Sequence, residues 1–126
     1  MAFERVFEIG PIFRAEPSRT LKHLSEAISL DAEMAYLNND EIMDVLEDMV
    51  KYVIRRVYER DRDLIERIRA PVIDLPDRFP RYTYSEVVKW INENVEELQE
   101  GEDLQAKHLE AFGGHVGGFY FIKEWP

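Results

Sequence analysis

Hydrophobic and polar residues alternate with a period of two near the start of the chain. Between residues 25 and 36 the even-numbered positions are mainly apolar, whereas the odd-numbered positions carry Ser29, Asp31 and Glu33 among alanines. This period predicts a β-strand. Unpaired carboxylates are too costly to bury in an apolar core, so the polar side is expected to face a cleft or solvent.

A second strand is expected just before it. Residues 5–13 are rich in β-branched and aromatic side chains, which favours a strand over a helix although their alternation is imperfect. Pro17 and Ser18 mark a turn between the two segments. The sequence therefore predicts a β-hairpin over residues 3–37.

The pattern changes to a helical period after the hairpin. Asn38 and Glu41 occupy the two positions of a capping box, which predicts a long helix from about Asp40 to at least Tyr58. The pattern resumes after a charged interruption at 59–63, so residues 39–69 are expected to be helical. The apolar positions that share one helical face are Ile42, Leu46, Met49, Val50, Val53, Ile54 and Val57.

Prolines and caps divide the remainder. Residues 70–82 form a proline-rich, extended connection over the surface, because the residue before Pro71 is disfavoured in a helix. Thr83 and Glu86 form another capping box, which opens the region 83–126. Here we expect a first helix with Trp90 in packing and with four residues pointing inward, namely Val87, Val88, Ile91 and Val95. A short helix follows, capped by Asp103 and carrying Leu104, His108, Leu109 and Phe112. A glycine-rich turn over 113–118 then leads into a strand over 119–122.

Composition limits the class of protein. The chain has 126 residues, of which 45% are hydrophobic and 33% charged, and this is typical of one globular domain. No apolar run approaches the roughly 18 residues of a membrane span, and no cysteine is present, which is compatible with the cytoplasm. The net charge of -10 argues against broad nucleic-acid affinity, so any RNA contact must be local.

Cations gather in the predicted hairpin loop. Residues 14–23 hold Arg14, Arg19, Lys22 and His23 with a single carboxylate, Glu16. A rigid hairpin that gathers these cations suits a polyphosphate, which arginine grips through its planar fork and lysine as a point charge. The alternative is a solvated hairpin tip with ordinary surface charges.

Two other charged or polar stretches are weaker candidates. Six arginines between residues 55 and 69 alternate with four carboxylates, which favours a solvated helix face over a phosphate track. His108 and His115 lack the spacing of a metal site, and no metal is predicted there. The glycines of 113–118 follow a helix, whereas a phosphate-binding loop precedes one.

One stretch resembles a known family. The segments Phe13-Arg14-Ala15-Glu16, Thr20-Leu21-Lys22-His23-Leu24, Glu26 and Leu30-Asp31-Ala32-Glu33-Met34 resemble motif 2 of the class II aminoacyl-tRNA synthetases. Within that class they are most similar to the aspartyl enzymes of the archaeal and eukaryotic kind. Looser matches follow at Phe79-Pro80-Arg81, Trp90, Gly101-Glu102-Asp103 and 119–126. The implied fold is α+β, a partial antiparallel sheet with a motif 2 hairpin, one long helix and two shorter helices.

The resemblance implies a reaction and a set of site residues. It implies ATP-dependent activation of aspartate and transfer of the aspartyl group to tRNA(Asp), with Arg14 as the catalytic contact to the α-phosphate. The implied ATP-binding residues are Arg14, Ala15, Glu16, Lys22, His23 and Leu24, and those meeting the tRNA acceptor end are Ser18, Arg19 and Thr20. Mg²⁺ is implied as a cofactor, with its ligands outside this chain.

This chain departs from the family pattern at two positions. Lys22 stands where arginine is frequent, so a bidentate contact would become a point charge. Ala27 stands where many relatives carry a phenylalanine that stacks on adenine. Asp31 and Glu33 match acidic positions, which either orient neighbouring cations or, for Asp31, belong to the site.

Three alternatives stay open at this point. An asparaginyl-tRNA synthetase or the synthetase-like asparagine synthetase of archaea would have a similar motif 2, and a non-catalytic paralogue or truncated piece would act only in binding. The resemblance also implies a cytoplasmic homodimer for the full-length protein and places motifs 1 and 3 outside these residues. Residues 1–126 are therefore expected to form part of one catalytic domain, with little or no aminoacylation in isolation.

Overall fold

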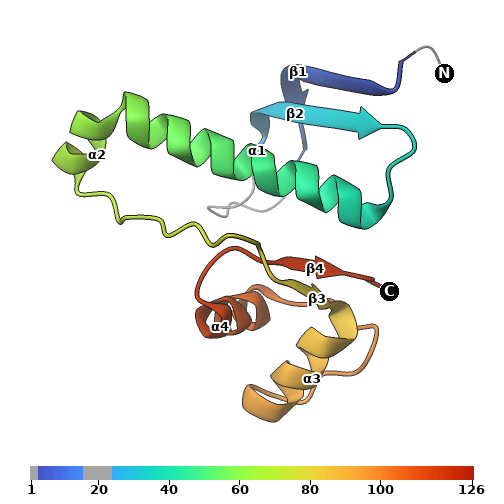
Figure 1. Ribbon diagram of the computed structural model, residues 1–126. Helices are drawn as coiled ribbons and strands as arrows, with labels where there is room; N and C mark the ends of the chain where they lie inside the picture. The colour runs from blue at the N-terminus through green and yellow to red at the C-terminus, as the bar shows by residue number, and fades with distance from the viewer. Residues whose placement is uncertain (1–2, 16–23) are drawn as a thin grey trace. The chain divides into compact units, whose positions relative to one another are not determined.

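The computed structural model describes residues 3–15 and 24–126. The chain divides into two compact units, Met1–Ile42 and Met43–Pro126. Figure 1 labels the elements, which are β1 (Arg5–Phe13), β2 (Glu26–Met34), α1 (Asn39–Arg60), α2 (Arg62–Ile68), β3 (Arg81–Thr83), α3 (Tyr84–Asn94), α4 (Ala106–Val116) and β4 (Phe121–Lys123). The α+β class expected from the sequence is confirmed, with four helices among the described residues.

The first unit contains the predicted hairpin. Strands β1 and β2 pair antiparallel, and the register extends from the pair Arg5–Met34 to the pair Phe13–Glu26. The first strand has the predicted bounds. The second is shorter than the predicted 25–36, because the chain turns after Met34 and Tyr36 adopts a left-handed backbone with φ of 66°.

The hairpin carries large apolar side chains that the described residues leave uncovered. Phe7 and Ile28, on β1 and β2, are 74% and 78% exposed. An isolated two-stranded hairpin is only marginally stable in water, since it has no second layer against which to bury such a face. Most of the hairpin's hydrophobic surface therefore contributes little stability within this unit.

Helix α1 begins with the predicted cap. The backbone N–H of Asn38 donates to Glu41 Oε2 at 2.8 Å, and the backbone N–H of Glu41 donates to Asn38 Oδ1 at 3.0 Å. These reciprocal bonds satisfy two of the donors that a helix start leaves free. The capping box predicted from the sequence is confirmed.

The charged interruption divides the helical region into two helices. The helix does not continue through the charged interruption: α1 stops at Arg60, and Asp61, with φ of -117° and ψ of 28°, separates it from α2. Aspartate favours a helix N-cap over a helix interior, because its side chain competes with the backbone for hydrogen bonds. Arg69 then ends α2 in a left-handed conformation with φ of 53°. The predicted long helix is confirmed as α1, and the helical pattern that resumes after the charged interruption forms a separate helix, α2.

The connection between α2 and β3 runs back along α1. The hydroxyl of Tyr58 donates to the carbonyl of Pro71 at 3.0 Å and accepts from the backbone N–H of Ile73 at 2.9 Å. Further along, Lys51 Nζ donates to the carbonyl of Asp77 at 2.5 Å. An extended connection was predicted, and these contacts hold it antiparallel to the helix.

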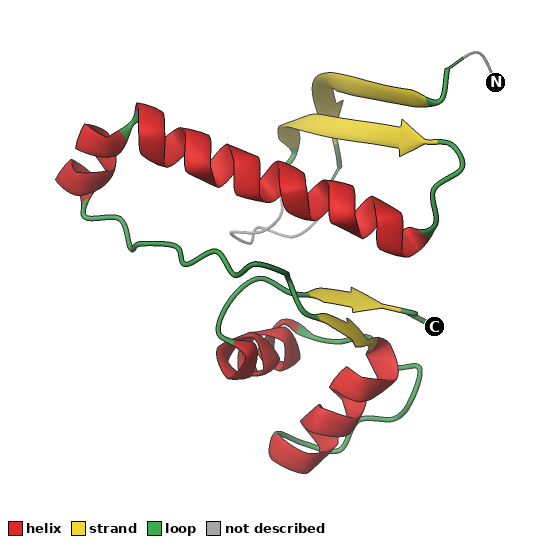
Figure 2. Ribbon diagram, in the orientation of Figure 1, coloured by secondary structure: helices red, strands yellow, loops and turns green. Residues whose placement is uncertain are grey.

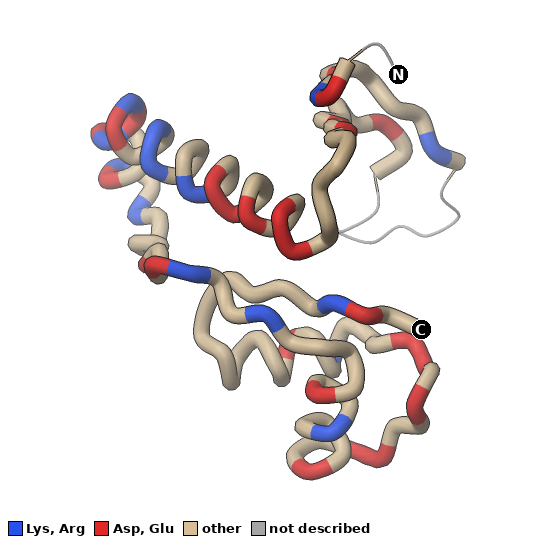
Figure 3. The backbone as a smooth tube through the Cα atoms, turned by 45° about the vertical axis from the view of Figure 1, so that its right-hand side comes forward, with Lys and Arg blue, Asp and Glu red and all other residues tan. Residues whose placement is uncertain are grey.

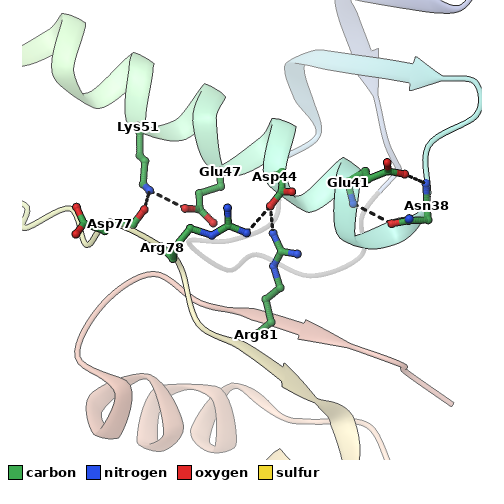
Figure 4. A network of polar contacts seen from close by, with 8 residues as sticks. All are labelled: Asn38, Glu41, Asp44, Glu47, Lys51, Asp77, Arg78 and Arg81. Carbon is green, nitrogen blue, oxygen red and sulfur yellow. Dashed lines mark hydrogen bonds and ion pairs between the residues drawn. The ribbon is translucent and has the colours of Figure 1, made fainter.

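A buried charged pair anchors this connection (Figure 4). Lys51 Nζ donates to Glu47 Oε1 at 2.6 Å, both side chains are buried, and the ammonium lies 5.1 Å from the ring centroid of Phe79. Burial alone would raise the pKa of Glu47, but Lys51, the backbone amide of Phe79 and the charge of Arg78 outweigh it and hold that pKa below its ordinary value. The carboxyl group of Glu47 is therefore ionised at neutral pH.

The remaining residues build a small core around two strands and two helices (Figure 2). Strands β3 and β4 pair in parallel from Arg81–Phe121 to Thr83–Lys123, a pair that the sequence did not predict. Val95, predicted to point inward, is 42% exposed because α3 ends at Asn94 and Val95 leaves the helical register. The buried residues of this core are Tyr84, Val87, Val88, Ile91, Leu98 and Phe112.

Helix α3 and its neighbours agree with the sequence in two further respects. Thr83 N–H donates to Glu86 Oε2 at 2.7 Å and Glu86 N–H donates to Thr83 Oγ1 at 3.2 Å, which confirms the predicted capping box. Trp90 packs edge-on against Phe112, with ring centroids 5.3 Å apart. The interpretation of Trp90 as a packing residue is supported.

Helix α4 differs from its prediction at both ends. It begins at Ala106 with Gln105 as its cap, not after Asp103. At the other end the helix continues through Gly113 and Gly114, which were predicted to form a turn, and Gly117 ends it with φ of 78°. Tyr120, just before the last strand, packs near Gly113: a side-chain carbon at position 113 would lie 3.5 Å from the Tyr120 hydroxyl, an ordinary contact distance.

His108 is a structural residue of α4. Its side chain is 1% exposed, its Nδ1 accepts the backbone N–H of Gln105 at 3.1 Å, and its Nε2 lies 2.7 Å from Glu96 Oε1. Because Nδ1 accepts, the proton sits on Nε2 and is donated to the carboxylate. Within residues 3–15 and 24–126 no three potential ligands are grouped as a metal site would require, and none of the helices there is long and apolar enough to cross a bilayer.

Replacing Thr83 with alanine tests the cap of α3. The substitution removes the acceptor for the Glu86 N–H, and we expect a loss of about 1 kcal/mol in the free energy of unfolding. Urea denaturation of the full-length protein followed by tryptophan fluorescence measures this loss. Thr83→Ser keeps the hydroxyl and should unfold at the wild-type midpoint. An alanine variant as stable as wild type would show that the cap contributes nothing.

Replacing Lys51 with methionine tests the buried pair. The variant leaves Glu47 buried without its ammonium partner, which should cost about 3–5 kcal/mol at pH 7 in urea denaturation. The double variant Glu47→Leu/Lys51→Met should recover most of this loss, because an apolar pair leaves no buried charge. Lys89→Met, at an exposed position of α3, is the matched control and should be neutral. A single variant no weaker than this control would contradict the role assigned to Lys51.

The same variant makes a prediction about pH. Folding lowers the pKa of Glu47 below 4.5, so its contribution to stability is present above that pH and is lost as the pH falls through the folded pKa. Without Lys51, burial raises the pKa and the sign reverses. The stability difference between wild type and Lys51→Met should therefore grow from about pH 4 to pH 7. A difference that stays constant over this range would exclude titration of Glu47 as its cause.

Candidate functional site

The register of the hairpin gives it one apolar and one polar face. Directly paired residues point to the same side of a sheet, and successive residues of a strand point to opposite sides. The apolar face carries Phe7, Ile9 and Phe13 on β1. The polar face carries the pairs Val6–Glu33, Glu8–Asp31, Gly10–Ser29 and Ile12–Ala27, and the next step along β1 is Arg14.

Three carboxylates surround a hollow on the polar face. The hollow has a volume of about 250 Å³ and is lined by Val6, Phe7, Glu8, Asp31 and Glu33. Ser29 Oγ donates to Asp31 Oδ2 at 2.9 Å and so orients this carboxylate. Glu8 and Asp31 are directly opposite each other, and like charges so placed repel. A ligand with a cationic group, such as an ammonium, would relieve this repulsion.

Arg14 provides the positive end of the same face. Its backbone N–H donates to the carbonyl of Ser25 at 2.9 Å, which extends the ladder one residue beyond Phe13. Its side chain is exposed and forms no ion pair with any residue that the structure describes. The ladder thus fixes the backbone while the guanidinium stays available for an anion.

The structure describes only some of the residues predicted for the site. Arg14, Ala15 and Leu24 are exposed where the two strands enter the loop. Residues 16–23 lie outside the described part of the chain, so the roles expected there stay predictions. The residues concerned are Glu16, Ser18, Arg19, Thr20, Lys22 and His23.

Glu8 is a candidate that the sequence analysis passed over. In the sequence it interrupts an imperfect alternation, whereas the register pairs it with Asp31. The pairing could have been obtained by counting outward from the loop, from Phe13–Glu26 to Glu8–Asp31. The register also pairs Ala27 with Ile12, and this face of the two strands has no aromatic side chain for stacking a base.

A second cluster of charges lies in the other unit and has a structural role (Figure 4). Arg78 donates to Asp44 Oδ1 at 2.8 Å, and Arg81 donates to the same oxygen. The hydrogen bond from Arg81 lowers the pKa of Asp44 most, and the charge of Arg78 adds to it. Because these groups pair with one another across α1 and β3, the cluster joins two elements instead of offering a free charge to a ligand.

Comparison with known proteins adds the family. The family model described as "tRNA synthetases class II (D, K and N)" matches residues 1–126. The aspartate--tRNA(Asp/Asn) ligase of Archaeoglobus fulgidus is 45% identical over 130 residues, a match that covers 98% of this chain and 29% of the relative.

Solved structures agree with this family. The asparaginyl-tRNA synthetase of Pyrococcus horikoshii, solved with asparaginyl-adenylate, has a TM-score of 0.92 and 30% identity, over 99% of this chain and 30% of that one. The aspartyl-tRNA synthetase of Entamoeba histolytica has a TM-score of 0.83 and 32% identity, over 98% of this chain and 27% of that one.

The chain thus spans about three tenths of the length of these relatives. The similarity nevertheless extends over nearly all of this chain, from the hairpin to the final strand. The implied class II synthetase fold is confirmed. Since the family model matches every residue from 1 to 126, the chain belongs to the class II tRNA synthetases of the D, K and N group.

Proposed function

We propose that this chain is part of the catalytic domain of an aspartate-tRNA ligase and supplies one wall of its ATP site. The observation that carries the proposal is the position of Arg14, exposed and without an ion pair among the described residues, at the end of a hairpin whose polar face holds three carboxylates. The name of the relative from A. fulgidus, an aspartate--tRNA(Asp/Asn) ligase, supports the same substrate.

Arg14 would act on the phosphate end of the reaction. A carboxylate oxygen of aspartate attacks the α-phosphorus of ATP, pyrophosphate leaves, and aspartyl-adenylate forms. Negative charge builds on the α-phosphoryl oxygens in the transition state, and a preorganised guanidinium there typically contributes about 10²–10³ to the rate. Because the ladder already fixes its backbone, Arg14 needs little reorganisation to make this contact.

The carboxylates of the polar face would act on the amino-acid end. Glu8 and Asp31 repel each other when no cation is present, and the α-ammonium of aspartate, bound in the hollow that they line, would relieve this repulsion. The contact would orient the substrate so that its carboxylate, and not its ammonium, meets the α-phosphate. Ser29 would hold Asp31 in place through its hydrogen bond.

The other expected contacts remain part of the proposal. Glu16 would meet the adenine end of ATP, Lys22 and His23 its phosphates, and Arg19 with its neighbours in the loop the acceptor end of tRNA(Asp). The family also implies Mg²⁺, but the described residues group no three potential ligands, so we assign no Mg²⁺ contact to them. A cytoplasmic homodimer is proposed for the full-length protein.

An asparaginyl-tRNA synthetase is the second candidate. The P. horikoshii structure, which has a TM-score of 0.92, is an asparaginyl enzyme, and the A. fulgidus relative is named for both tRNA(Asp) and tRNA(Asn). The two amino acids differ only in the side-chain carboxylate or amide, which Glu8 and Asp31 would not contact in this proposal. An asparagine synthetase or a non-catalytic paralogue would share the fold and differ in the reaction.

Arg14→Ala tests the proposed role in activation. In ATP–pyrophosphate exchange by the full-length protein with aspartate, we expect kcat to fall about 10²–10³-fold, because transition-state charge loses its partner. Arg14→Lys should keep part of the activity, since it restores the charge without the fork. Arg5→Ala is the matched control, an arginine of the same strand on the opposite face, and should leave kcat unchanged.

Two results would contradict this assignment. Normal exchange by Arg14→Ala would remove Arg14 from the ATP site. Exchange that requires asparagine, with none supported by aspartate, would select the asparaginyl alternative.

Asp31→Asn tests the amino-acid end. Loss of the negative charge should raise KM for aspartate about tenfold or more and leave KM for ATP nearly unchanged, because the hydrogen bond to a charged group is lost. Glu26→Gln, on the opposite face of β2, is the matched control. An equal rise in both KM values would indicate a general loss of structure and not an ammonium contact.

A further inference from the structure

Two hollows lie on either side of Tyr58, where the connection from α2 runs back along α1. One has a volume of about 400 Å³ and the other about 350 Å³, and both are lined by Tyr58 and Val72. Their other apolar lining residues are Ile65 and Ala70 in the first, and Ile54, Ile73 and Leu75 in the second. We call these two hollows together the Tyr58 groove.

The groove has a well-defined floor. The hydroxyl of Tyr58 is held between the carbonyl of Pro71 and the N–H of Ile73, so the ring separating the two hollows is fixed. Val72, between those two backbone contacts, is 85% exposed. An exposed aliphatic side chain on a fixed backbone can bury its surface against an apolar group of a partner with little loss of conformational entropy.

The rim of the groove is positively charged once internal ion pairs are taken into account. Arg62 pairs with Glu66 at 3.1 Å, and Glu59 pairs with Arg56 at 3.0 Å, so both glutamates on the rim are neutralised. The remaining rim charges are Arg55, in the second hollow, and Arg69, in the first. Neither has an ion-pair partner within residues 3–15 and 24–126.

These charges belong to the basic end of α1. Figure 3 shows acidic residues along the first turns of the helix, and Lys and Arg interspersed with acidic residues toward its end and on α2. In a chain with a net charge of -10, this is a local reversal of sign. A partner with negative charge is attracted to this end of the helix and repelled by most of the remaining surface.

We propose that the Tyr58 groove binds an acidic peptide segment, with a bulky apolar side chain seated beside Val72 and carboxylates paired with Arg55 and Arg69. The two arginines lie one in each hollow, so carboxylates on both sides of a central apolar residue match the groove. This interaction is separate from aminoacylation and involves none of the residues assigned to the ATP site.

Nucleic acid fits the same surface less well. The groove is lined mainly by aliphatic side chains, and its single aromatic ring, Tyr58, is half-buried with its hydroxyl engaged, whereas single-stranded nucleic acids stack their bases on exposed rings. Asp61 and Asp63 are interleaved with the arginines and would repel a continuous phosphate backbone. A peptide can place its few carboxylates at the two free guanidiniums and avoid these acids.

A peptide library displayed on phage tests the proposal with the full-length protein as target. The library consists of random 12-residue peptides, and each round is depleted on the variant Arg55→Gln/Arg69→Gln. We expect enriched peptides with a surplus of Asp and Glu around a Leu, Ile or Phe. A synthetic, fluorescein-labelled copy of the most enriched peptide should bind wild type saturably in fluorescence anisotropy.

Variants then locate the site. Arg55→Gln/Arg69→Gln should weaken binding of the labelled peptide about tenfold, as expected for two exposed charge pairs, and Val72→Asp should weaken it at least as much. Arg56→Gln is the matched control, because Arg56 lies on the same helix, is paired with Glu59 and lines neither hollow. All of these variants should keep wild-type aminoacylation, which also verifies that they are folded.

Several outcomes would overturn the proposal. It fails if no peptide is enriched, if enriched peptides lack an acidic surplus, or if the Arg55/Arg69 double variant binds as wild type does. It also fails if a copy of the peptide with Gln for each Glu and Asp binds equally well, or if a 12-nucleotide poly-U RNA displaces the peptide at lower concentration. Since aminoacylation is measured separately, failure here leaves the proposed function untouched.

Discussion

The buried charge of Lys51 is the constraint on which the second unit depends. Its ammonium needs partners because an isolated charge in an apolar environment is very costly, and it finds Glu47 on its own helix and the carbonyl of Asp77 on the returning segment. The same ammonium lies over Phe79, which stacks on Phe119 at a centroid distance of 5.1 Å. One charge thus joins α1, the connection and the approach to β4. Buried pairs of this kind specify an arrangement more than they add net stability.

This pair also explains why the helical pattern of α1 was only partly informative. The predicted apolar positions all lie on α1, but five of the seven are exposed, Val53 among them at 50%, and the buried residues of the helix are Glu47 and Lys51. Periodicity identifies which residues share a face but not what that face meets. Glu47 and Lys51, four residues apart, match an ordinary surface ion pair in sequence. Only the carbonyl of Asp77 and the ring of Phe79, far along the chain, distinguish the buried case.

Predictions from the sequence succeeded where the chemistry is local. The boxes at Asn38–Glu41 and Thr83–Glu86 require only residues three apart, and both formed as expected. The start of α4 was not predicted correctly, because its capping box is formed by Gln105 and His108, which are not the usual capping residues. The imidazole of His108 is buried and also contacts Glu96. Likewise, Gly113 and Gly114 lie inside α4, although the glycine-rich sequence indicated a turn there. The candidate site divides in a similar way: Arg14 was proposed from its motif alone, whereas Glu8 became a candidate only through the strand register.

The net charge of the chain has to be reconciled with the anionic substrates that are proposed for it, ATP and tRNA. A net charge of -10 opposes long-range attraction of ATP or tRNA, so affinity must come from short-range contacts. In its proposed role, Arg14 would meet this requirement, because its backbone N–H is fixed in the ladder. A cation held at one position stabilises negative charge that develops at that position. Such a cation lowers the energy of the transition state more than it strengthens binding of the substrate. Under the proposed function, an acidic surface with a few fixed cations would give up non-specific affinity for polyanions and keep the contact that accelerates the reaction.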